Sequence, residues 1–191
     1  MATKQTRTES DLIGALEIPM ECKYGVQTFR AIDNFPITGI GINRYPNIVK
    51  YLGVIKKAAA VANYETGKIS KEIYEGIVKA CDDVIAGKYN DQFPVDVIQG
   101  GAGTSTNMNA NEVIANVALE YMGHEPGQYE FCSPNDHVNG SQSTNDAYPC
   151  AVHLAMYADH LEMVKHLDML IESLEKKAEE YKNIIKMGRT Q

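Results

Sequence analysis

The sequence predicts a mainly α-helical protein that begins with a short hairpin or loop region. Apolar residues recur at spacings of three and four along three middle segments and one much longer segment near the end. Glycine and proline are frequent before residue 43, where short β-favouring pieces lie between them. The chain has 191 residues, of which 44% are hydrophobic and 23% charged, as in ordinary globular proteins.

Charge and composition exclude several classes of protein. Eighteen basic against 25 acidic residues give a net charge of −7, which argues against a nucleic-acid binder. The first ten residues lack an apolar stretch and no run of about 18 apolar residues exists, so we expect neither a signal peptide nor a membrane span. The four cysteines form no C-x-x-C pair and are typical of reduced thiols, which predicts a soluble, cytoplasmic protein.

The first predicted element lies within residues 5–43, where a small hairpin or loop region is expected, with Tyr24–Phe29 as one β-favouring piece. A first helix is then expected from Pro46, with Gly67 just past its end. A second helix is expected after Ser70 as its N-cap, running to Gly87.

A third helix is expected from about Asn109 to Gly123, and two polar stretches flank it. These are Gln99–Asn109 and His124–Ser143, both predicted to be nearly structureless. Long polar loops of this kind usually serve a function.

The longest helix is expected from about Thr144 to Met187, with Pro149 in its first turns, where the missing N–H would cost no helical bond. Roughly 40 residues would make a helix of about 60 Å, against a radius of gyration of about 16 Å for a compact domain of this size. We therefore expect it to pack against other subunits or a further C-terminal part, and the chain to be a fragment of a longer helical protein.

The first polar stretch concentrates groups that could bind an anion. Its glycines allow close backbone approach to a ligand, and its hydroxyls and amides can donate hydrogen bonds. It is not a dinucleotide fingerprint, because the third glycine is absent. The alternative interpretation is a polar loop that caps the third helix, with Asn107 or Asn109 as N-cap.

The second polar stretch ends where the long helix begins. Backbone N–H groups and the positive end of the helix dipole would there meet the hydroxyls of Ser143 and Thr144, which favours a carboxylate site. The alternative is ordinary capping by one residue of the run Ser143, Thr144, Asn145 and Asp146. Capping needs one such residue and not four, so we favour a site.

No metal site is expected. The five histidines include His153 and His160, seven residues apart on one predicted helix, but no cysteine or carboxylate lies at ligand spacing. Packed or solvated histidines are the simpler interpretation. The terminal Gly188-Arg189-Thr190-Gln191 indicates by itself only the end of a helix.

Taken together, the three polar segments resemble the three-region active site of the aspartase/fumarase superfamily. The match spans nearly the whole chain, from Arg7-Thr8-Glu9 to the terminal Gly188–Gln191. The string from Gly100 to Glu112 and the run Ser141–Asp146 resemble the aspartase branch, whereas fumarases usually carry G-S-G-T-Q in the first and two serines in the second. Gln191 also stands where most other members have histidine.

This resemblance implies an all-α, L-aspartase-like fold with a small N-terminal domain, a short hairpin and a long central helical bundle in a homotetramer. We accordingly predict an N-terminal, mainly helical domain over residues 1–142 and the first long helix of the bundle over 143–191. In the family each active site draws its three regions from three subunits. The predicted long helix would be one member of that bundle.

The resemblance also implies a reaction, the reversible β-elimination of ammonia from L-aspartate to give fumarate through an aci-carboxylate, with no cofactor. It implies hydroxyl groups around the β-carboxylate: Thr104, Ser143 and Thr144. It implies three residues around the amino group: Asn145, Thr190 and Gln191.

In the family the catalytic base is a serine on a mobile loop with the signature G-S-S-x-M-P-x-K-x-N-P. That signature is absent from this sequence, so we expect no catalytic base and no activity in the 191-residue fragment alone. Two alternatives stay open: a class II fumarase-type hydratase acting on malate, and a catalytically silent helical scaffold. Thr104, Ser143, Thr144, Asn145 and Thr190 argue against the scaffold, because folding does not need all five.

Overall fold

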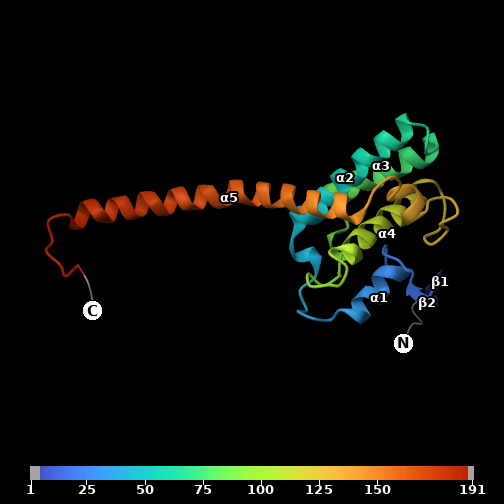
Figure 1. The fold of residues 1–191 in the computed structure, drawn as a ribbon, viewed down its shortest axis with the longest axis horizontal. Coiled ribbons are helices and arrows are strands. Elements are labelled where there is room, and N and C mark those ends of the chain that lie inside the picture. The colour runs from blue at the N-terminus through green and yellow to red at the C-terminus, as the bar shows by residue number, and fades with distance from the viewer. Residues whose placement is uncertain (1–4, 189–191) are drawn as a thin grey trace. The chain divides into compact units, whose positions relative to one another are not determined.

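The computed structural model describes residues 5–188 of the chain, and most of them are helical (Figure 1). The strands and α-helices in chain order are β1 (Thr6–Asp11), β2 (Gly14–Pro19), α1 (Val26–Asn34), α2 (Pro46–Glu65), α3 (Lys71–Ile85), α4 (Thr104–Tyr121) and α5 (Thr144–Tyr181). Three short helical turns lie between them: η1 (Ile42–Arg44), η2 (Asn90–Gln92) and η3 (Pro134–Val138). The prediction of a mainly α-helical fold with a short hairpin is confirmed.

The hairpin is antiparallel, with Thr6 opposite Pro19 and Asp11 opposite Gly14. The carboxylate of Asp11 accepts hydrogen bonds from the backbone N–H groups of Ile13 and Gly14 at 2.9 and 3.1 Å, which closes the two-residue turn. The side chain of an aspartate therefore supplies the turn chemistry.

The prediction of a β-favouring piece at Tyr24–Phe29 was wrong, because α1 begins at Val26. Its N-cap, Gly25, has no side chain to cap the helix, and Glu112 of α4 does so instead. The Glu112 carboxylate accepts hydrogen bonds from the backbone N–H groups of residues 25, 27 and 28 at 2.9–3.0 Å. Glu9 accepts the remaining first-turn N–H, that of Val26, at 3.0 Å. A tertiary contact thus satisfies the donors that a helix start leaves free.

The two helices α2 and α3 form where local signals predict them. Gly67 takes a φ of +72° after α2, and the N–H of Lys68 donates to the carbonyl of Asn63 at 2.8 Å, which is a Schellman C-cap. Ser70 caps α3, because its Oγ accepts the N–H of Ile73 at 3.3 Å. Both predictions are confirmed.

The fourth helix, α4, is the central element, and every residue from Thr106 to Leu119 is buried. It begins at Thr104, five residues earlier than predicted, so neither Asn107 nor Asn109 is its N-cap and the first polar stretch is partly helical. Gly103, with a φ of +94°, turns the chain directly before the helix. The side-chain oxygen of Gln99 accepts the N–H of Thr106 at 2.9 Å and takes the place of a local cap.

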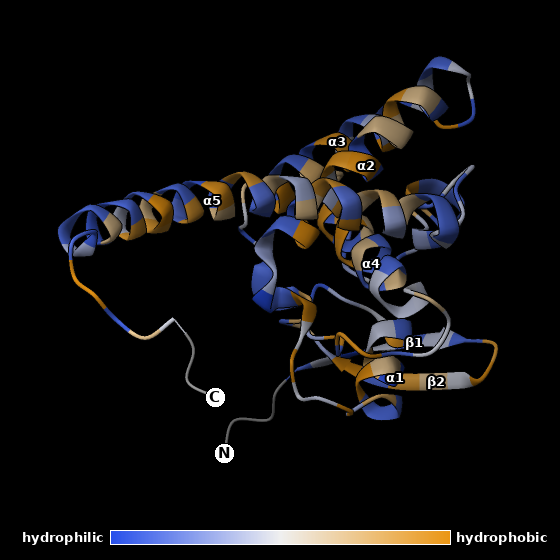
Figure 2. Ribbon diagram, turned by 60° about the vertical axis from the view of Figure 1, so that its left-hand side comes forward, coloured by the Kyte–Doolittle hydropathy of each residue, from blue (hydrophilic) through white to orange (hydrophobic). Residues whose placement is uncertain are grey.

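The core lies where α2, α3 and α4 pack, and hydrophobic residues recur along all three helices (Figure 2). Its apolar members include Val49, Leu52, Ile77, Val84, Phe93, Val113, Ile114 and Leu119. Two charged side chains, Lys56 and Glu112, are as fully buried as these residues. Each is therefore satisfied by hydrogen bonds inside the protein.

The long helix α5 begins at Thr144 as predicted and ends at Tyr181, six residues before the predicted end. Pro149 is its sixth residue, past the first turn, and it has no N–H to donate to the carbonyl of Asn145. The prediction that this proline costs no helical bond was therefore wrong. The second polar stretch, expected to be structureless, contains the helical turn η3, which begins at the proline after Ser133.

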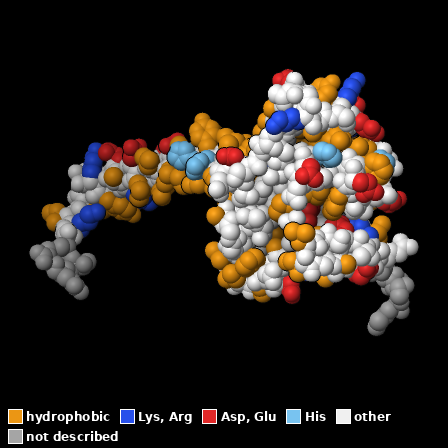
Figure 3. Space-filling model, turned by 45° about the vertical axis from the view of Figure 1, so that its right-hand side comes forward, with side chains coloured by type: hydrophobic (Ala, Val, Ile, Leu, Met, Phe, Trp, Pro, Cys, Tyr) orange, Lys and Arg blue, Asp and Glu red, His pale blue; other side chains and the backbone are white. Residues whose placement is uncertain are grey.

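The chain divides into two compact units, Met1–Ala155 and Met156–Gln191, which are described separately. In the second unit, large apolar side chains of α5 are exposed beside charged ones (Figure 3): Met156, Tyr157, Leu161, Met163, Leu167, Met169, Leu170, Ile171 and Leu174. The predicted boundary between domains at residues 142 and 143 stays a prediction. Within residues 5–188 no helix is both long and apolar enough to cross a membrane.

Candidate active site

Two helix N-termini come together in the first compact unit. A Cβ placed on Gly103, the N-cap of α4, would lie 2.3 Å from a ring carbon of Tyr148 in the second turn of α5. Only a glycine allows the start of α4 to approach α5 this closely. A cavity of about 450 Å³ opens beside this contact, lined by Gln99 and Gly103 on one side and by Tyr148 and His153 on the other.

Part of the polar run at the start of α5 has a capping role. The Oγ of Ser143 accepts the N–H of Asn145 at 3.1 Å, and the N–H of Ser143 donates to Asp146 Oδ2 at 3.0 Å. This reciprocal pair is a capping box. The capping interpretation therefore holds for Ser143 and Asp146, while Thr144 and Asn145 are not needed for it.

Thr144 instead faces α4 through Asn107. The Asn107 amide nitrogen donates to Thr144 Oγ1 at 3.1 Å and to Asn139 Oδ1 at 3.1 Å. Asn107 lies one turn after Thr104, whose hydroxyl donates to the carbonyl of Gly101 at 2.6 Å. One buried amide thus links the two predicted threonine segments.

A buried lysine of α2 lies beneath this link. Lys56 has no exposed surface, and its ammonium donates to Asn139 Oδ1 at 2.8 Å and to Gln142 Oε1 at 3.1 Å. Burial lowers the pKa of Lys56 to about 7. The segment that leads into α5 is therefore attached to the core of the protein by hydrogen bonds.

The structure places four predicted site residues near these two helix starts: Thr104 and Ser143, both exposed, Thr144, half-buried, and Asn145, exposed. Thr190 and Gln191 lie outside the described residues. The roles assigned to all six stay predictions. Within residues 5–188 no three His, Cys, Asp or Glu side chains gather closely enough to hold a metal ion.

Sequence reasoning missed the residues behind the site, namely Lys56, Asn107 as a bridge, Asn139 and Gln142. For Lys56, the sequence pattern contained one indication that the side chain is buried. It occupies a position in the buried stripe of α2, four residues after Leu52 and four before Ala60. A lysine at such a position is unusual, because a buried charge needs partners.

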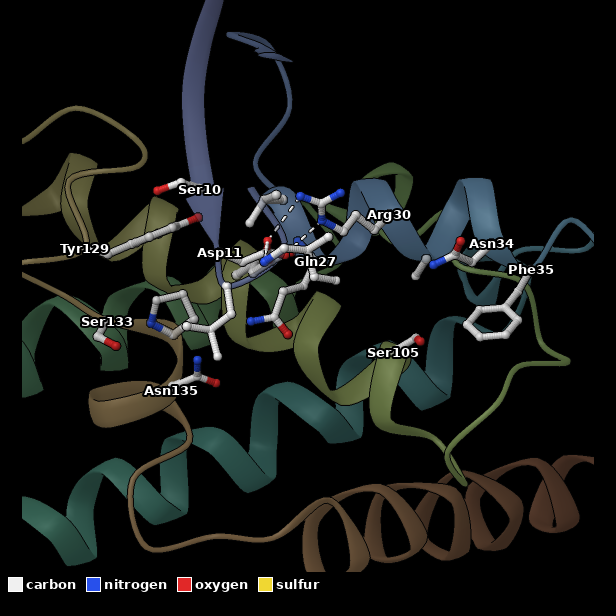
Figure 4. A pocket seen from close by; sticks show the side chains of 16 residues that line it. Ser10, Asp11, Gln27, Arg30, Asn34, Phe35, Ser105, Tyr129, Ser133 and Asn135 are labelled. Atoms are coloured by element: carbon white, nitrogen blue, oxygen red, sulfur yellow. Dashed lines mark hydrogen bonds and ion pairs between the residues drawn. The ribbon is translucent and has the colours of Figure 1, made fainter. Parts of the chain in front are cut away.

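A larger cavity of about 770 Å³ lies elsewhere, between the end of β1, α1 and the start of η3 (Figure 4). Arg30 reaches toward Asp11 there, and its guanidinium nitrogens donate to both carboxylate oxygens at 2.9 and 3.1 Å. None of the four predicted site residues that fall within residues 5–188 lines this cavity, although Ser105, next to Thr104, does. Its arginine is paired with the carboxylate of Asp11.

The comparison with known families decides which class of protein this is. A family model described as "Lyase" matches residues 14–191. The chain belongs to this lyase family. The resemblance seen in the motifs is therefore confirmed at the level of the family.

Individual relatives of this chain are named aspartate ammonia-lyases. The chain is 56% identical over 184 residues to that of a Bacillus species, covering 96% of this chain and 39% of the relative. It is 55% identical over 185 residues to that of Helicobacter pylori strain J99, covering 97% and 40%. The Escherichia coli K12 protein is 52% identical over 186 residues, covering 97% and 39%. This lyase chain thus spans about two fifths of the length of these relatives.

Solved structures show the same relationship. A fumarate lyase:delta crystallin from Brucella melitensis in native form matches with a TM-score of 0.91 and 50% identity, over 98% of this chain and 44% of that one. A class II fumarase from Schistosoma mansoni matches with a TM-score of 0.83 and 37% identity, over 97% of this chain and 39% of that one. Identity is lower to the fumarase than to the aspartate ammonia-lyases.

Proposed function

We propose that the natural-length protein containing this chain is an aspartate ammonia-lyase, which converts L-aspartate reversibly to fumarate and ammonia. The observation that carries the proposal is identity of 52–56% to three proteins of that name over 96–97% of this chain. The substrate is a small dicarboxylic amino acid, and no cofactor is required. The site chemistry described above suits a carboxylate.

In the proposed reaction, negative charge develops on the β-carboxylate of the substrate, and the site has hydrogen-bond donors for that group. Removal of a proton from Cβ leaves a carbanion that delocalises into the β-carboxylate, which becomes an aci-carboxylate with a second negative charge. Hydroxyl groups and helix N-termini aimed at that carboxylate stabilise the developing charge more than the ground state. In this proposal Ser143 and Thr144, at the start of α5, supply those hydroxyls. Thr104, at the start of α4, joins them when its proton turns from the carbonyl of Gly101 to the substrate.

The amino group would lie on the other side of the substrate. Asn145, Thr190 and Gln191 surround it in this proposal, and the base is a serine outside the present sequence. The 191-residue chain alone is therefore expected to lack activity. A complete site also needs segments from other subunits, so the protein is proposed to act as a homotetramer in the cytoplasm.

The exposed apolar residues of α5 support the proposed assembly. Met156, Leu167 and Leu174 keep 63%, 45% and 60% of their surface exposed in the single chain. Helices with such residues usually bury them against a partner. Other copies of α5 would supply that partner in a central bundle.

The proposal is tested by product formation and by one substitution. The natural-length protein should release ammonia and fumarate from L-aspartate in equal amounts. Thr144→Ala should lower kcat/KM by about 10²-fold, because it removes a donor to the developing charge. Light scattering should show the same oligomer for both proteins, and wild-type turnover in the variant would contradict the role of Thr144.

The second candidate function is hydration of fumarate to malate. The similarity to the Schistosoma mansoni class II fumarase favours it, because the same carboxylate site could hold a hydroxy acid. The two reactions differ in whether an ammonium or a hydroxyl group leaves. Activity with L-malate and none with L-aspartate would decide for the hydratase.

A further inference from the structure

Lys56 is a buried lysine with no acidic partner among residues 5–188. It has no exposed surface, and its hydrogen bonds go to the amide oxygens of Asn139 and Gln142 at 2.8 and 3.1 Å. Burying a charge is costly, and a neutral side chain of the same length would pack there without that cost. The position therefore calls for a property that a nitrogen donor supplies and an apolar side chain does not.

That property is a fixed direction of the hydrogen bonds, with the donor on the lysine and the acceptor on the amide. The Lys56 nitrogen donates to two amide oxygens, and the oxygen of the Asn139 amide therefore faces Lys56. The nitrogen of the same amide then faces the carbonyl of Gln142, at 3.2 Å. Asn107 reaches the same Asn139 oxygen, so it must present its nitrogen there, at 3.1 Å.

The same order of donors and acceptors extends through Asn107 to Thr144 at the predicted site. The Asn107 nitrogen also donates to Thr144 Oγ1, so this hydroxyl accepts from the protein and its own proton is left for another acceptor. The arrangement has a cost, because Asn107 Oδ1 is buried and has no hydrogen-bond partner within residues 5–188. Turning the Asn107 amide over would bring that oxygen against the oxygen of Asn139, which Lys56 holds in place.

We propose that Lys56 is a positioning residue for the carboxylate site. Through the chain Lys56–Asn139–Asn107–Thr144 it fixes the direction of each hydrogen bond, so that the Thr144 proton is donated to the substrate carboxylate. The inference rests on the proposed function. It assigns a task in that function to a residue that does not touch the substrate.

A merely structural role would consist of holding residues 139–142 in place. The two roles differ in how a Lys56 substitution combines with the loss of the Thr144 hydroxyl. If Lys56 acts by orienting the Thr144 proton, removal of that proton leaves Lys56 nothing to orient. Independent structural damage would instead multiply with the effect of Thr144→Ala.

The test is a double-mutant cycle of Lys56→Met and Thr144→Ala in the natural-length protein, with kcat and KM measured for L-aspartate. Each single variant is expected to lower kcat/KM by about 10- to 100-fold. The double variant should be no worse than the worse single one. A double variant whose loss equals the product of the two single losses would overturn the proposal.

Lys57→Met is the matched control. Lys57 is the adjacent residue of α2, but its ammonium pairs with Asp82 at 2.6 Å and takes no part in the chain to Thr144. It should keep kcat/KM within about twofold of the wild type, as distant surface changes do. A loss equal to that of Lys56→Met would show that removing a lysine from this part of α2 lowers activity whether or not it is linked to Thr144, which would contradict the proposal.

Two substitutions of Asn139 provide a second test if the Lys56→Met variant fails to fold. Asn139→Asp keeps an oxygen acceptor for both Lys56 and Asn107, whereas Asn139→Leu removes it. The aspartate variant should retain about tenfold more kcat/KM than the leucine variant. Equal losses in the two variants would overturn the proposal.

Binding of succinate, a dicarboxylate probe, separates failure of this inference from failure of the proposed function. If the wild type does not turn over L-aspartate, the proposed function is wrong, and calorimetry with succinate across the same cycle still tests Lys56. Weaker binding in both singles with no further loss in the double variant supports the proposal. Absence of succinate binding by the wild type, or multiplied losses, overturns it.

Discussion

At the scale of single residues, buried Glu112 connects two segments that lie more than 80 positions apart. Its carboxylate accepts the N–H groups of Gly25, Gln27 and Thr28 and the hydroxyl of Thr28, at 2.6–3.0 Å. Burial raises the pKa of Glu112 to about 7, although these hydrogen bonds act to lower it. The carboxylate thus holds α1 against the central helix.

Glu112→Gln should therefore destabilise the protein. A glutamine turns an NH₂ group toward donors that need an acceptor, which is expected to cost about 2–4 kcal/mol in the free energy of unfolding. Urea denaturation measures this cost. The control is Glu120→Gln on the same helix, where a partly exposed carboxylate pairs with Lys23; a cost equal to that of the control would contradict the capping role.

Buried Lys56 makes stability depend on pH. Burial lowers its pKa in the folded protein from 10.5 to about 7. Between these two values the unfolded chain binds more protons than the folded one, so this group makes the free energy of unfolding rise with pH. Urea denaturation at pH 7 and at pH 9 should show that rise in the wild type, and a smaller rise in Lys56→Met. An equal rise in the two proteins would show that Lys56 does not cause it.

Glu112 acts in the opposite direction and at lower pH. Its pKa is raised from 4.5 to about 7 on folding, so its contribution is fully present below pH 4.5 and is lost as pH rises toward 7. The two groups together predict a minimum near neutral pH in their joint contribution to stability.

At the scale of elements, the starts of α4 and α5 depend on one glycine. Gly103 has a φ of +94° and no room for a Cβ beside Tyr148, whereas Gly123 has a φ of +81° and nothing within 4 Å. Gly103→Ala and Gly123→Ala should share a backbone cost of about 1 kcal/mol. Gly103→Ala should then cost at least about 2 kcal/mol more, because the ring of Tyr148 must move. Urea denaturation of both variants measures the difference, and equal costs would contradict the close contact.

The elements also show which features could be predicted from the sequence. The end of α2 and the start of α3 were predictable because Gly67 and Ser70 cap them from within a few residues. The start of α1 was not, because its cap comes from Glu112, which lies more than 80 positions away. The start of α4 was missed because Gln99 takes the role of the N-cap from a loop.

The residues of the candidate site also differ in whether a local sequence pattern could predict them. Ser143 and Thr144 could be singled out because they stand in a local polar run at a helix start. Lys56 and Asn107 could not be linked to them, because the hydrogen bonds that join them form only when α2, α4 and the segment before α5 pack together. The residues proposed to meet the substrate could be predicted from a local pattern, whereas those proposed to orient them could not.

At the scale of the whole molecule, the exposed apolar residues of α5 predict self-association. The 191-residue chain should form oligomers, and Leu167→Glu with Leu174→Glu should weaken them, because both leucines are about half exposed in the single chain. Light scattering after size-exclusion chromatography measures the mass. Glu175→Gln, on the same helix, is the control and should not change it. A monomeric wild-type chain would contradict the proposed bundle.

The central claim is that the natural-length protein eliminates ammonia from L-aspartate. The most direct test is absorbance of fumarate near 240 nm, followed in parallel with L-aspartate and with L-malate as substrates. The proposed function predicts that fumarate forms from L-aspartate alone. Fumarate from L-malate alone would identify a hydratase, and no fumarate from either substrate would contradict an enzymatic role and favour a helical scaffold.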